Sequence, residues 1–281
     1  KPHNMELNSH NRARSFMFAI ENGRTDKLLR YEDGPDYDPD RPFDPDFHRT
    51  NNAYPGQRIV FAADGTAFLP MVANTLGEPS KAGVVLMRRD VPTGAWTPSN
   101  VVRIDPKLSR RGLLEPDVEC LRDGRILIVC RASGGEASPC RNWCTYSTDG
   151  GRTLEPLAEL RYDDGSPFYA PGSIHRFQRS AGSGRLYWIA NIVAQPDGDG
   201  PRYPLYIAEI DENRMAVRKN SLVMVDDRRI DEGDTEKLQL SNFAVVENRE
   251  TLEIEIYITR IGQSENFWKA GVCRYIFAPP Q

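Results

Sequence analysis

Apolar and polar positions alternate along most of this chain from about residue 50 onward, in short runs that suit strands better than helices. One pattern recurs, an apolar run, a tight polar turn and a second apolar run, in residues 58–72, 116–131, 173–192 and 241–260. The turn glycines Gly65, Gly124 and Gly184 lie 59 and 60 residues apart, and the fourth turn, near Glu250, follows about one period later. Repeats of this length predict an all-β fold built from propeller blades.

The repeat sets the expected organisation. Residues 1–49 form an N-terminal segment, and residues 50–281 form blades at about 50–110, 111–166, 167–230 and 231–281. Helical patterns are almost absent apart from a short helical turn expected around residues 22–30. Prolines separate closely spaced aspartates in residues 32–48, and since the Gly and Glu spacing of an EF-hand is missing, we expect a solvated, extended segment rather than a calcium loop there. These aspartates are Asp33, Asp36, Asp38, Asp40, Asp44 and Asp46.

Composition narrows the function classes. The chain has 36 Lys and Arg against 40 Asp and Glu, a formal net charge of −4, which argues against nucleic acid or an anionic membrane as the main partner. No run approaches the ~20 apolar residues that a membrane helix needs. The 5 cysteines include Cys140-x3-Cys144, but no second Cys or His pair completes a zinc site, so we expect small buried residues.

The most specific local motif is Ser147-x-Asp149-x-Gly151-x-Thr153 followed by Leu154, in which Ser, Asp and Thr side chains can bond the backbone of a turn. It resembles the Asp-box of sialidase (neuraminidase) superfamily propellers, and degenerate versions occur at residues 90–96 and 211–217. In that family the box stabilises an outer turn, so the resemblance implies no catalytic role for Ser147 or Asp149.

Further segments are similar to the same superfamily. Residues 112–118, with Glu115-Pro116, the hairpin up to Arg131, residues 166–175 and the strand that begins at Arg202 resemble its inner strands, and the match runs from about residue 50 to the end. The resemblance implies a six-bladed ancestry, arginines Arg131 and Arg202 that bind a substrate carboxylate, and Glu115 as the glutamate that activates a tyrosine nucleophile.

The chain departs from the family pattern at two points. Leu240 stands where the nucleophilic tyrosine is expected, and the Arg-Ile-Pro motif of the first blade is absent, with Arg58-Ile59-Val60 a faint echo. Two explanations stay open: the chain is the C-terminal part of a six-bladed enzyme, or it is a relative with its own chemistry. Four blades plus one formed by the N-terminal segment would also fit a five-bladed propeller. The start at Lys1-Pro2 fits either a removed leader or an internal fragment.

The candidate site consists of polar residues at the starts of inner strands, because propeller strands begin at the central funnel. Glu115 with Asp117 or Asp164 is the candidate carboxylate pair of a glycosidase, and His175 is either an acid/base residue or a buried structural histidine. The expected catalytic residues are Glu115, Asp117 and His175, and the expected substrate-binding residues are Arg58, Arg131, Arg202, Tyr54, Tyr169 and Asn242.

Aromatic residues divide into two groups. Trp96, Trp143, Trp188 and Trp268 are expected in the core, whereas Tyr54, Phe168 and Tyr169, in loops next to inner strands, are the expected sugar platforms.

The resulting expectation is a sialidase-like exo-glycosidase that acts on an acidic or polar glycan, with no cofactor and no metal. The alternatives are a non-catalytic glycan-binding or interaction propeller and a truncated sialidase-like enzyme. The resemblance is compatible with a secreted or periplasmic location, while the chain shows no signal peptide; the sequence leaves the compartment, the sugar and the oligomeric state open.

Overall fold

The computed structural model describes residues 18–21, 24–28, 38, 40–41, 44–75, 77–196 and 198–280. These residues form two compact units, the first made of residues up to 130 together with 144–158, and the second of residues 131–143 together with 159–281. The chain therefore passes from the first unit to the second within strand β10 (Ile126–Ala132) and returns within β11 (Asn142–Ser147).

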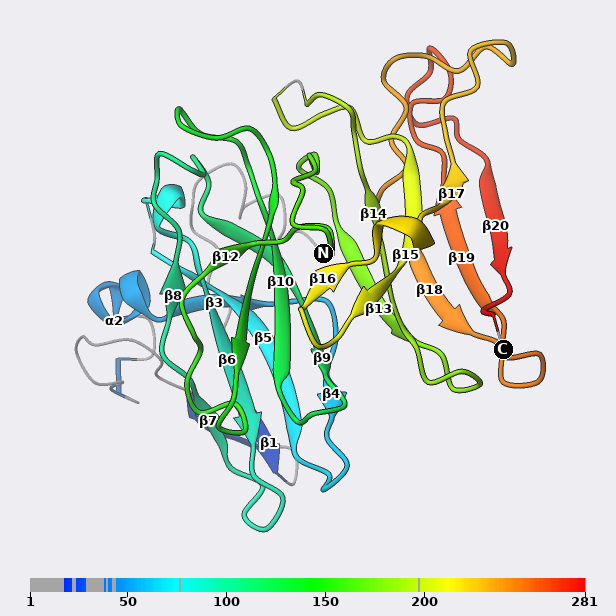
Figure 1. Ribbon diagram of the computed structural model, residues 1–281. Helices are drawn as coiled ribbons and strands as arrows, with labels where there is room; N and C mark the ends of the chain where they lie inside the picture. The colour runs from blue at the N-terminus through cyan, green and yellow to red at the C-terminus, as the bar shows by residue number, and fades with distance from the viewer. Residues whose placement is uncertain are drawn as a thin grey trace. The chain divides into compact units, whose positions relative to one another are not determined.

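The first unit contains an antiparallel sheet with the order β3-β5-β6-β7, in which β4 also pairs with β5 and β8 with β6 (Figure 1). Alternate residues of β5 and β6 face the core, where Met71, Ala73, Val85 and Met87 are buried. Its strands are β3 (Asn52–Pro55), β4 (Val60–Phe61), β5 (Ala67–Asn74), β6 (Gly83–Arg89), β7 (Trp96–Pro98) and β8 (Val102–Arg103), with a 3-10 turn, η1 (Pro79–Lys81).

The next repeat segment forms a four-stranded sheet of order β12-β11-β10-β9, with β9 spanning Leu113–Cys120 and β12 spanning Ala158–Glu159. Every residue of β10 is buried, as its nearly continuous apolar sequence predicts.

The second unit holds two further antiparallel sheets, one with the order β13-β14-β15-β16 plus β17 on β15, and one with the order β18-β19-β20. Ile254, Ile256 and Ile258 alternate along β19 and pack with Ile189 and Ile207 in one cluster. Burying each such side chain stabilises the fold by about 1.5–3 kcal/mol. The elements are β13 (His175–Arg179), β14 (Leu186–Asn191), β15 (Leu205–Asp211), β16 (Ala216–Val217), η2 (Lys219–Ser221), β17 (Val223–Asp226), β18 (Ala244–Glu247), β19 (Ile254–Thr259) and β20 (Val272–Phe277).

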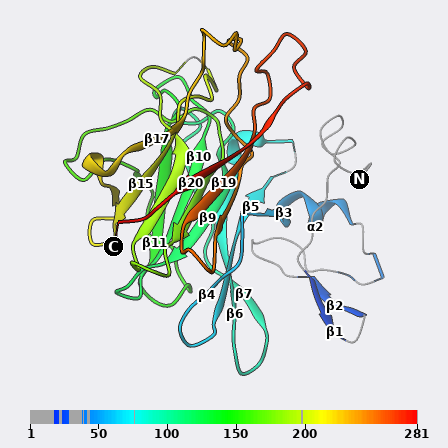
Figure 2. The same cartoon turned by 90° about the vertical axis from the view of Figure 1, so that its right-hand side faces the viewer.

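The N-terminal segment differs from the prediction. Residues 24–28, expected in a helical turn, form strand β2 (Arg24–Leu28), which pairs with β1 (Phe18–Glu21) in the hairpin drawn in blue in Figure 2. A six-residue helix, α2 (Pro45–Thr50), replaces the extended path expected at its end, because the Asp44 carboxylate accepts hydrogen bonds from the Asp46 and Phe47 backbone N–H groups. Asp33 and Asp36 lie outside the described residues.

The turns of the repeat confirm the hairpin predictions. Gly65 and Gly124 adopt φ of 85° and 88°, and in each turn the preceding aspartate, Asp64 or Asp123, accepts a hydrogen bond from the backbone N–H two residues on. The turn at Asp163-Asp164-Gly165 closes in the same way, with Gly165 at φ 82° and the Tyr162 N–H donating to Ser166 O.

Candidate functional site

Glu115 has an unusual backbone conformation for a strand residue. It lies in β9 with φ 48°, a left-handed value that costs an L-residue about 1–2 kcal/mol, and its side chain is half-buried between the buried Leu114 and Asp117. The neighbouring Pro116 carbonyl accepts a hydrogen bond from Gln57 N at 3.0 Å. Strain of this kind persists only where the surroundings hold it, which makes Glu115 the foremost functional candidate of the first unit.

Arg58 and Asp117, both predicted site residues, are in direct contact. Arg58 Nε donates to Asp117 Oδ1 at 3.1 Å, and Nη2 donates to Glu119 Oε2 at 2.7 Å and to the Val118 carbonyl at 3.0 Å. Burial, which lowers the pKa of Arg58, is outweighed by the two carboxylate charges, so that its pKa is raised. Asp117 is fully buried. The ion cluster therefore holds the part of β9 that follows Glu115.

Tyr54 lies in β3, not in a loop, and packs against Val72, Ala82 and Leu114 while staying half-exposed. Nearby, a Cβ on Gly56 would lie 2.3 Å from the Pro116 carbonyl oxygen, so only glycine permits this approach of the chain to β9.

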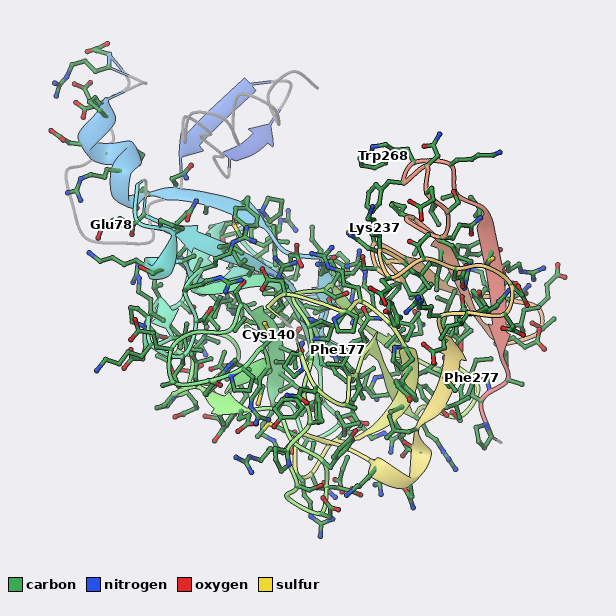
Figure 3. All side chains as sticks on the ribbon, turned by 90° about the horizontal axis from the view of Figure 1, so that it is seen from above. Glu78, Cys140, Phe177, Lys237, Trp268 and Phe277 are labelled. Carbon is green, nitrogen blue, oxygen red and sulfur yellow. The ribbon has the colours of Figure 1, made fainter. Side chains whose placement is uncertain are left out.

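In the second unit, Arg131 is 6% exposed and its Nη1 donates to the Gly172 carbonyl at 2.9 Å. Gly172 N in turn donates to Asp199 O, and a Cβ on Gly172 would lie 2.9 Å from the Asp199 side chain. Cys140, labelled in Figure 3, contacts the segment that contains Asp199, because its Sγ lies 2.8 Å from Gly198 O. The Arg131 guanidinium is therefore bound to the backbone at Gly172, a position that no sequence motif marks.

His175 is fully buried at the start of β13. Its Nδ1 lies 3.1 Å from Asn142 Nδ2, within hydrogen-bond distance. The ring also lies 6.2 Å from the Trp188 ring, centroid to centroid.

Arg202 is half-buried, and its Nη1 donates to Gln239 Oε1 at 3.1 Å. Next to Gln239, Leu240 is fully buried in the cluster of β14, β15 and β19, so the position where the resemblance leads one to expect a tyrosine nucleophile is part of the core. Asn191 links the segment 202–204 to Leu240, because its Nδ2 donates to the carbonyls of Arg202, Pro204 and Leu240 at 3.1–3.2 Å.

Tyr169 is half-exposed, and the Arg141 guanidinium lies 4.7 Å from its ring centroid. Phe168 was expected to offer a sugar platform, but it is only 5% exposed and packs against the Tyr162 and Trp188 rings. The prediction for Phe168 was wrong because its ring fills an aromatic cluster. Asn242 is exposed and adopts a left-handed φ of 57°.

Of the tryptophans expected in the core, Trp188 is buried, and Trp96 and Trp143 are half-buried. Trp268 contradicts the prediction, because it is 79% exposed on the loop between β19 and β20. Of the cysteines, all free, Cys130, Cys140 and Cys144 are buried and Cys120 and Cys273 partly so.

The Ser147 to Thr153 turn forms the predicted hydrogen bonds. The Ser147 hydroxyl donates to Asp149 at 2.8 Å and accepts from Gly151 N at 2.8 Å, while the Asp149 carboxylate also accepts from Thr153 N and Oγ1 at 3.0 and 2.7 Å. The Ser147, Asp149 and Thr153 side chains thus bond within the turn, which is a structural arrangement.

The partners Glu119, Asn142, Asn191 and Gln239 were missed by sequence reasoning. Asn142 and Asn191 stand at the ends of apolar strands, where a buried amide needs hydrogen-bond partners, and this was the one signal available for them.

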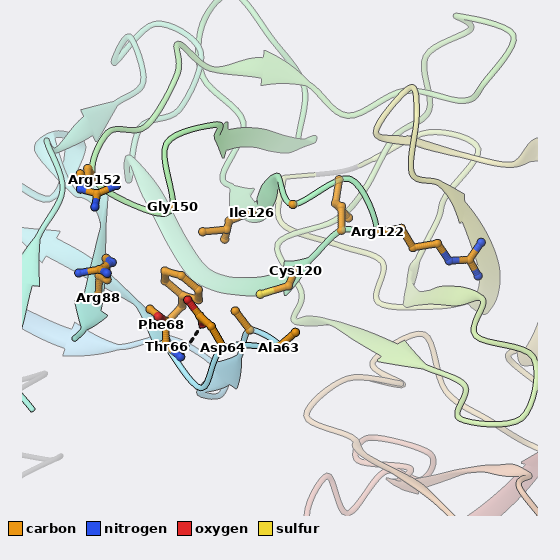
Figure 4. Close-up of a pocket in the computed structure, with 13 residues that line it drawn as sticks. Ala63, Asp64, Thr66, Phe68, Arg88, Cys120, Arg122, Ile126, Gly150 and Arg152 are labelled. Carbon is orange, nitrogen blue, oxygen red and sulfur yellow. Dashed lines mark hydrogen bonds between the residues drawn. The ribbon is translucent and has the colours of Figure 1, made fainter. Parts of the chain in front are cut away.

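A cavity of about 510 Å³ opens in the first unit beside the turns at Gly65 and Gly124. Phe68 and Ile126 line it, and Arg88 and Arg152 lie together on one side, as Figure 4 shows. None of the predicted site residues lines this cavity.

Within the described residues no group of three or more His, Cys, Asp or Glu side chains is placed to hold a metal ion. The described part of the chain likewise contains no helix that is both long and apolar enough to cross a membrane.

Comparisons with known proteins locate the fold. No protein-family model matches the sequence, and no curated protein matches it. A protein of unknown function from Dyadobacter fermentans is similar in structure, with a TM-score of 0.55, 15% identity and coverage of 98% of this chain and 69% of that one. NanB sialidase from Streptococcus pneumoniae gives a TM-score of 0.54 and 13% identity over 80% of this chain.

This chain spans only 31% of the NanB sialidase chain. Levansucrase from B. megaterium, at 9% identity and a TM-score of 0.50, matches over 80% of this chain and 66% of its own. At these identities the similarities establish the architecture alone. Together with the antiparallel sheets described above, they show that the protein has an all-β, propeller-like fold of the kind found in sialidases.

Proposed function

We propose that the protein is a glycoside hydrolase of the sialidase superfamily, exo-acting on an acidic or polar glycan. Three lines support the proposal: the motifs that resemble the superfamily, a fold shared with a sialidase, and the geometry of Glu115. The observation that carries it is the left-handed backbone of a half-buried glutamate, φ 48°, two residues before Asp117, the fully buried member of an ion cluster with Arg58. Such strain is typical of residues held for function.

In the proposed mechanism Glu115 is the acid/base residue: its carboxyl group protonates the glycosidic oxygen as the bond from that oxygen to the anomeric carbon breaks, and the resulting carboxylate takes a proton from the water that then attacks this carbon. Asp117 is committed to Arg58, so we assign the pair to positioning β9. Arg131 and Arg202 bind the acidic group of the substrate, because guanidinium groups offer bidentate donors and stay charged. His175, Tyr169, Tyr54 and Asn242 remain proposed site residues without an individual step.

The test is hydrolysis of a panel of aryl glycosides that includes sialosides, uronides and neutral sugars. Glu115→Gln is expected to lower kcat/KM at least a hundredfold, the range for loss of a general acid/base, while Arg131→Ala raises mainly KM. Glu250→Gln, a change of an exposed carboxylate in the β18–β19 turn, is the matched control and keeps full activity. Full turnover by Glu115→Gln would contradict the assignment.

A binding propeller without hydrolysis is the second candidate, and the buried Leu240 favours it, because the family's phenol has no counterpart at that position. Saturable glycan binding with no turnover of any panel member would decide for this alternative.

A further inference from the structure

Trp268 is the most exposed of the large hydrophobic side chains in the described residues, at 79%. It lies on the loop 260–271 that joins β19 to β20 and is labelled in Figure 3. Single exposed apolar residues are common on protein surfaces, so the surroundings of Trp268 must decide whether it has a role.

The ring is supported from behind. Phe267 packs edge-on against it, with ring centroids 5.0 Å apart and an interplanar angle of 89°. The Phe267 carbonyl accepts a hydrogen bond from Gly262 N at 2.9 Å, and Gly262 has a left-handed φ of 77°. A Cβ on Gly262 would lie 2.2 Å from Lys237 O, so glycine is needed for the loop to pass this segment.

Further hydrogen bonds anchor the same loop to the segment 235–239. The Thr235 hydroxyl donates to Gly262 O at 2.7 Å, and Gln239 N donates to Ile261 O at 2.7 Å. The Trp268 indole is thus carried by a braced loop, which lowers the entropy cost of holding a ligand against it.

This loop leads directly to a residue of the proposed site. Gln239 bonds Ile261 through its backbone and the Arg202 guanidinium through its side chain, at 3.1 Å. Two exposed lysines belong to the same region: Lys269 follows Trp268 in the sequence, and the backbone of Lys237 lies against Gly262 of the loop. An aromatic face that is backed by a second ring, on a loop associated with two exposed lysines, suits a sugar ring that carries an acidic group.

We propose that Trp268, backed by Phe267, is a stacking platform for a sugar ring of an acidic oligosaccharide, with Lys237 facing its carboxylate. The inference deepens the proposed function, on which it rests for the role of Arg202. It implies that the natural ligand is an oligosaccharide, because a platform on this loop holds a ring in addition to the one bound by the arginine.

The test measures binding, not turnover, in the Glu115→Gln background. Tryptophan fluorescence is titrated with 3′-sialyllactose and with lactose, which differ by the acidic sugar. Trp268→Ala is expected to weaken sialyllactose binding roughly tenfold, Trp268→Phe to restore most of it, and Lys237→Ala to remove the preference over lactose. Because Trp268 supplies part of the signal, calorimetry repeats the affinities. The matched control is Phe61→Ala, since Phe61 is an aromatic residue 68% exposed in the first unit.

Unchanged affinity in Trp268→Ala, an equal loss in Phe61→Ala, or no saturable binding of either probe would overturn the platform. Equal affinity for the two probes would overturn the acidic sugar. Failure of the hydrolase proposal looks different: no panel member is turned over by the wild type, while Trp268→Ala still loses affinity.

Discussion

Leu252 in the β18–β19 hairpin occupies the same turn position as Gly184 in the β13–β14 hairpin. In each turn the backbone N–H of this residue donates at 2.8 Å to the residue four positions before it, Asn248 or Ser180, and φ is 60° for Leu252 and 68° for Gly184. The same turn therefore forms with and without glycine. A leucine in this conformation carries the strain that glycine avoids.

Leu252→Gly is accordingly expected to be neutral or to raise the free energy of unfolding by up to about 1 kcal/mol, in spite of the lost side chain. Gly184→Ala, the reverse change in the matching turn, should lower it by about 1 kcal/mol. Urea unfolding of both variants measures this. A loss above about 1 kcal/mol in Leu252→Gly would show that leucine packing, and not backbone strain, governs the turn.

Replacing Glu115 by glycine should separate stability from activity. Glu115→Gly removes the strain at φ 48° and is expected to raise the free energy of unfolding by about 1 kcal/mol while it abolishes hydrolysis. Glu115→Gln keeps the strain and should unfold like the wild type. If Glu115→Gly is less stable than Glu115→Gln, the glutamate stem contributes packing that outweighs the strain.

Asp117→Asn is expected to destabilise the protein by about 3 kcal/mol, because it removes the fully buried partner of the Arg58 guanidinium. Glu119→Gln should cost less, about 1 kcal/mol, since the Glu119 side chain is 11% exposed whereas the Asp117 side chain is fully buried. Denaturant midpoints of the two variants test this order, and equal losses would contradict it.

The turn 147–153 should lose stability in acid, when the Asp149 carboxylate becomes protonated. Burial, which raises its pKa, is outweighed by hydrogen bonds from Thr153 and Ser147, which bring it to about 2, below the ordinary 3.8. The stabilisation is therefore present above about pH 3.8 and is lost as the pH falls toward about 2. Asp149→Asn should unfold more easily at neutral pH and show a flatter acid profile over this window. Parallel profiles for variant and wild type would argue against the assignment.

Gly262→Ala tests the support of the Trp268 platform without touching the aromatic rings. The added methyl would collide with Lys237 O, so the loop must shift, and sialyllactose affinity is expected to fall about as far as in Trp268→Ala. Gly233→Ala, at another left-handed glycine with open space around its Cβ position, is the control for backbone strain alone. Retained affinity in Gly262→Ala would mean that the loop needs no such brace.

The β architecture was predictable because the signals are local. Hairpins at Asp64-Gly65 and Asp123-Gly124 follow from turn chemistry, and the buried β10 follows from its apolar run. Helix α2 was missed, although Asp44-Pro45 is a capping signal, because the surrounding prolines favoured an extended path.

The side-chain partners of the candidate site residues were less predictable from the sequence than the strands. Nothing in the sequence marks Gln239 as the partner of Arg202 or Asn142 as that of His175, since these pairs are 37 and 33 residues apart. The prediction that Trp268 lies in the core was wrong, because the sequence near a strand does not show whether an aromatic ring faces the core or the solvent.

Residues 144–158 belong to the first unit, although residues 131–143 before them belong to the second. Neither unit is therefore a continuous stretch of sequence. Asn100 secures the return, since its side chain accepts from Leu154 N at 2.7 Å and donates to Leu154 O at 3.1 Å. Cleavage in the loop between β10 and β11 would therefore give two fragments, each carrying part of the other's unit. Such fragments could regain the fold only by complementation, and gene fission at this point would not yield two independent modules.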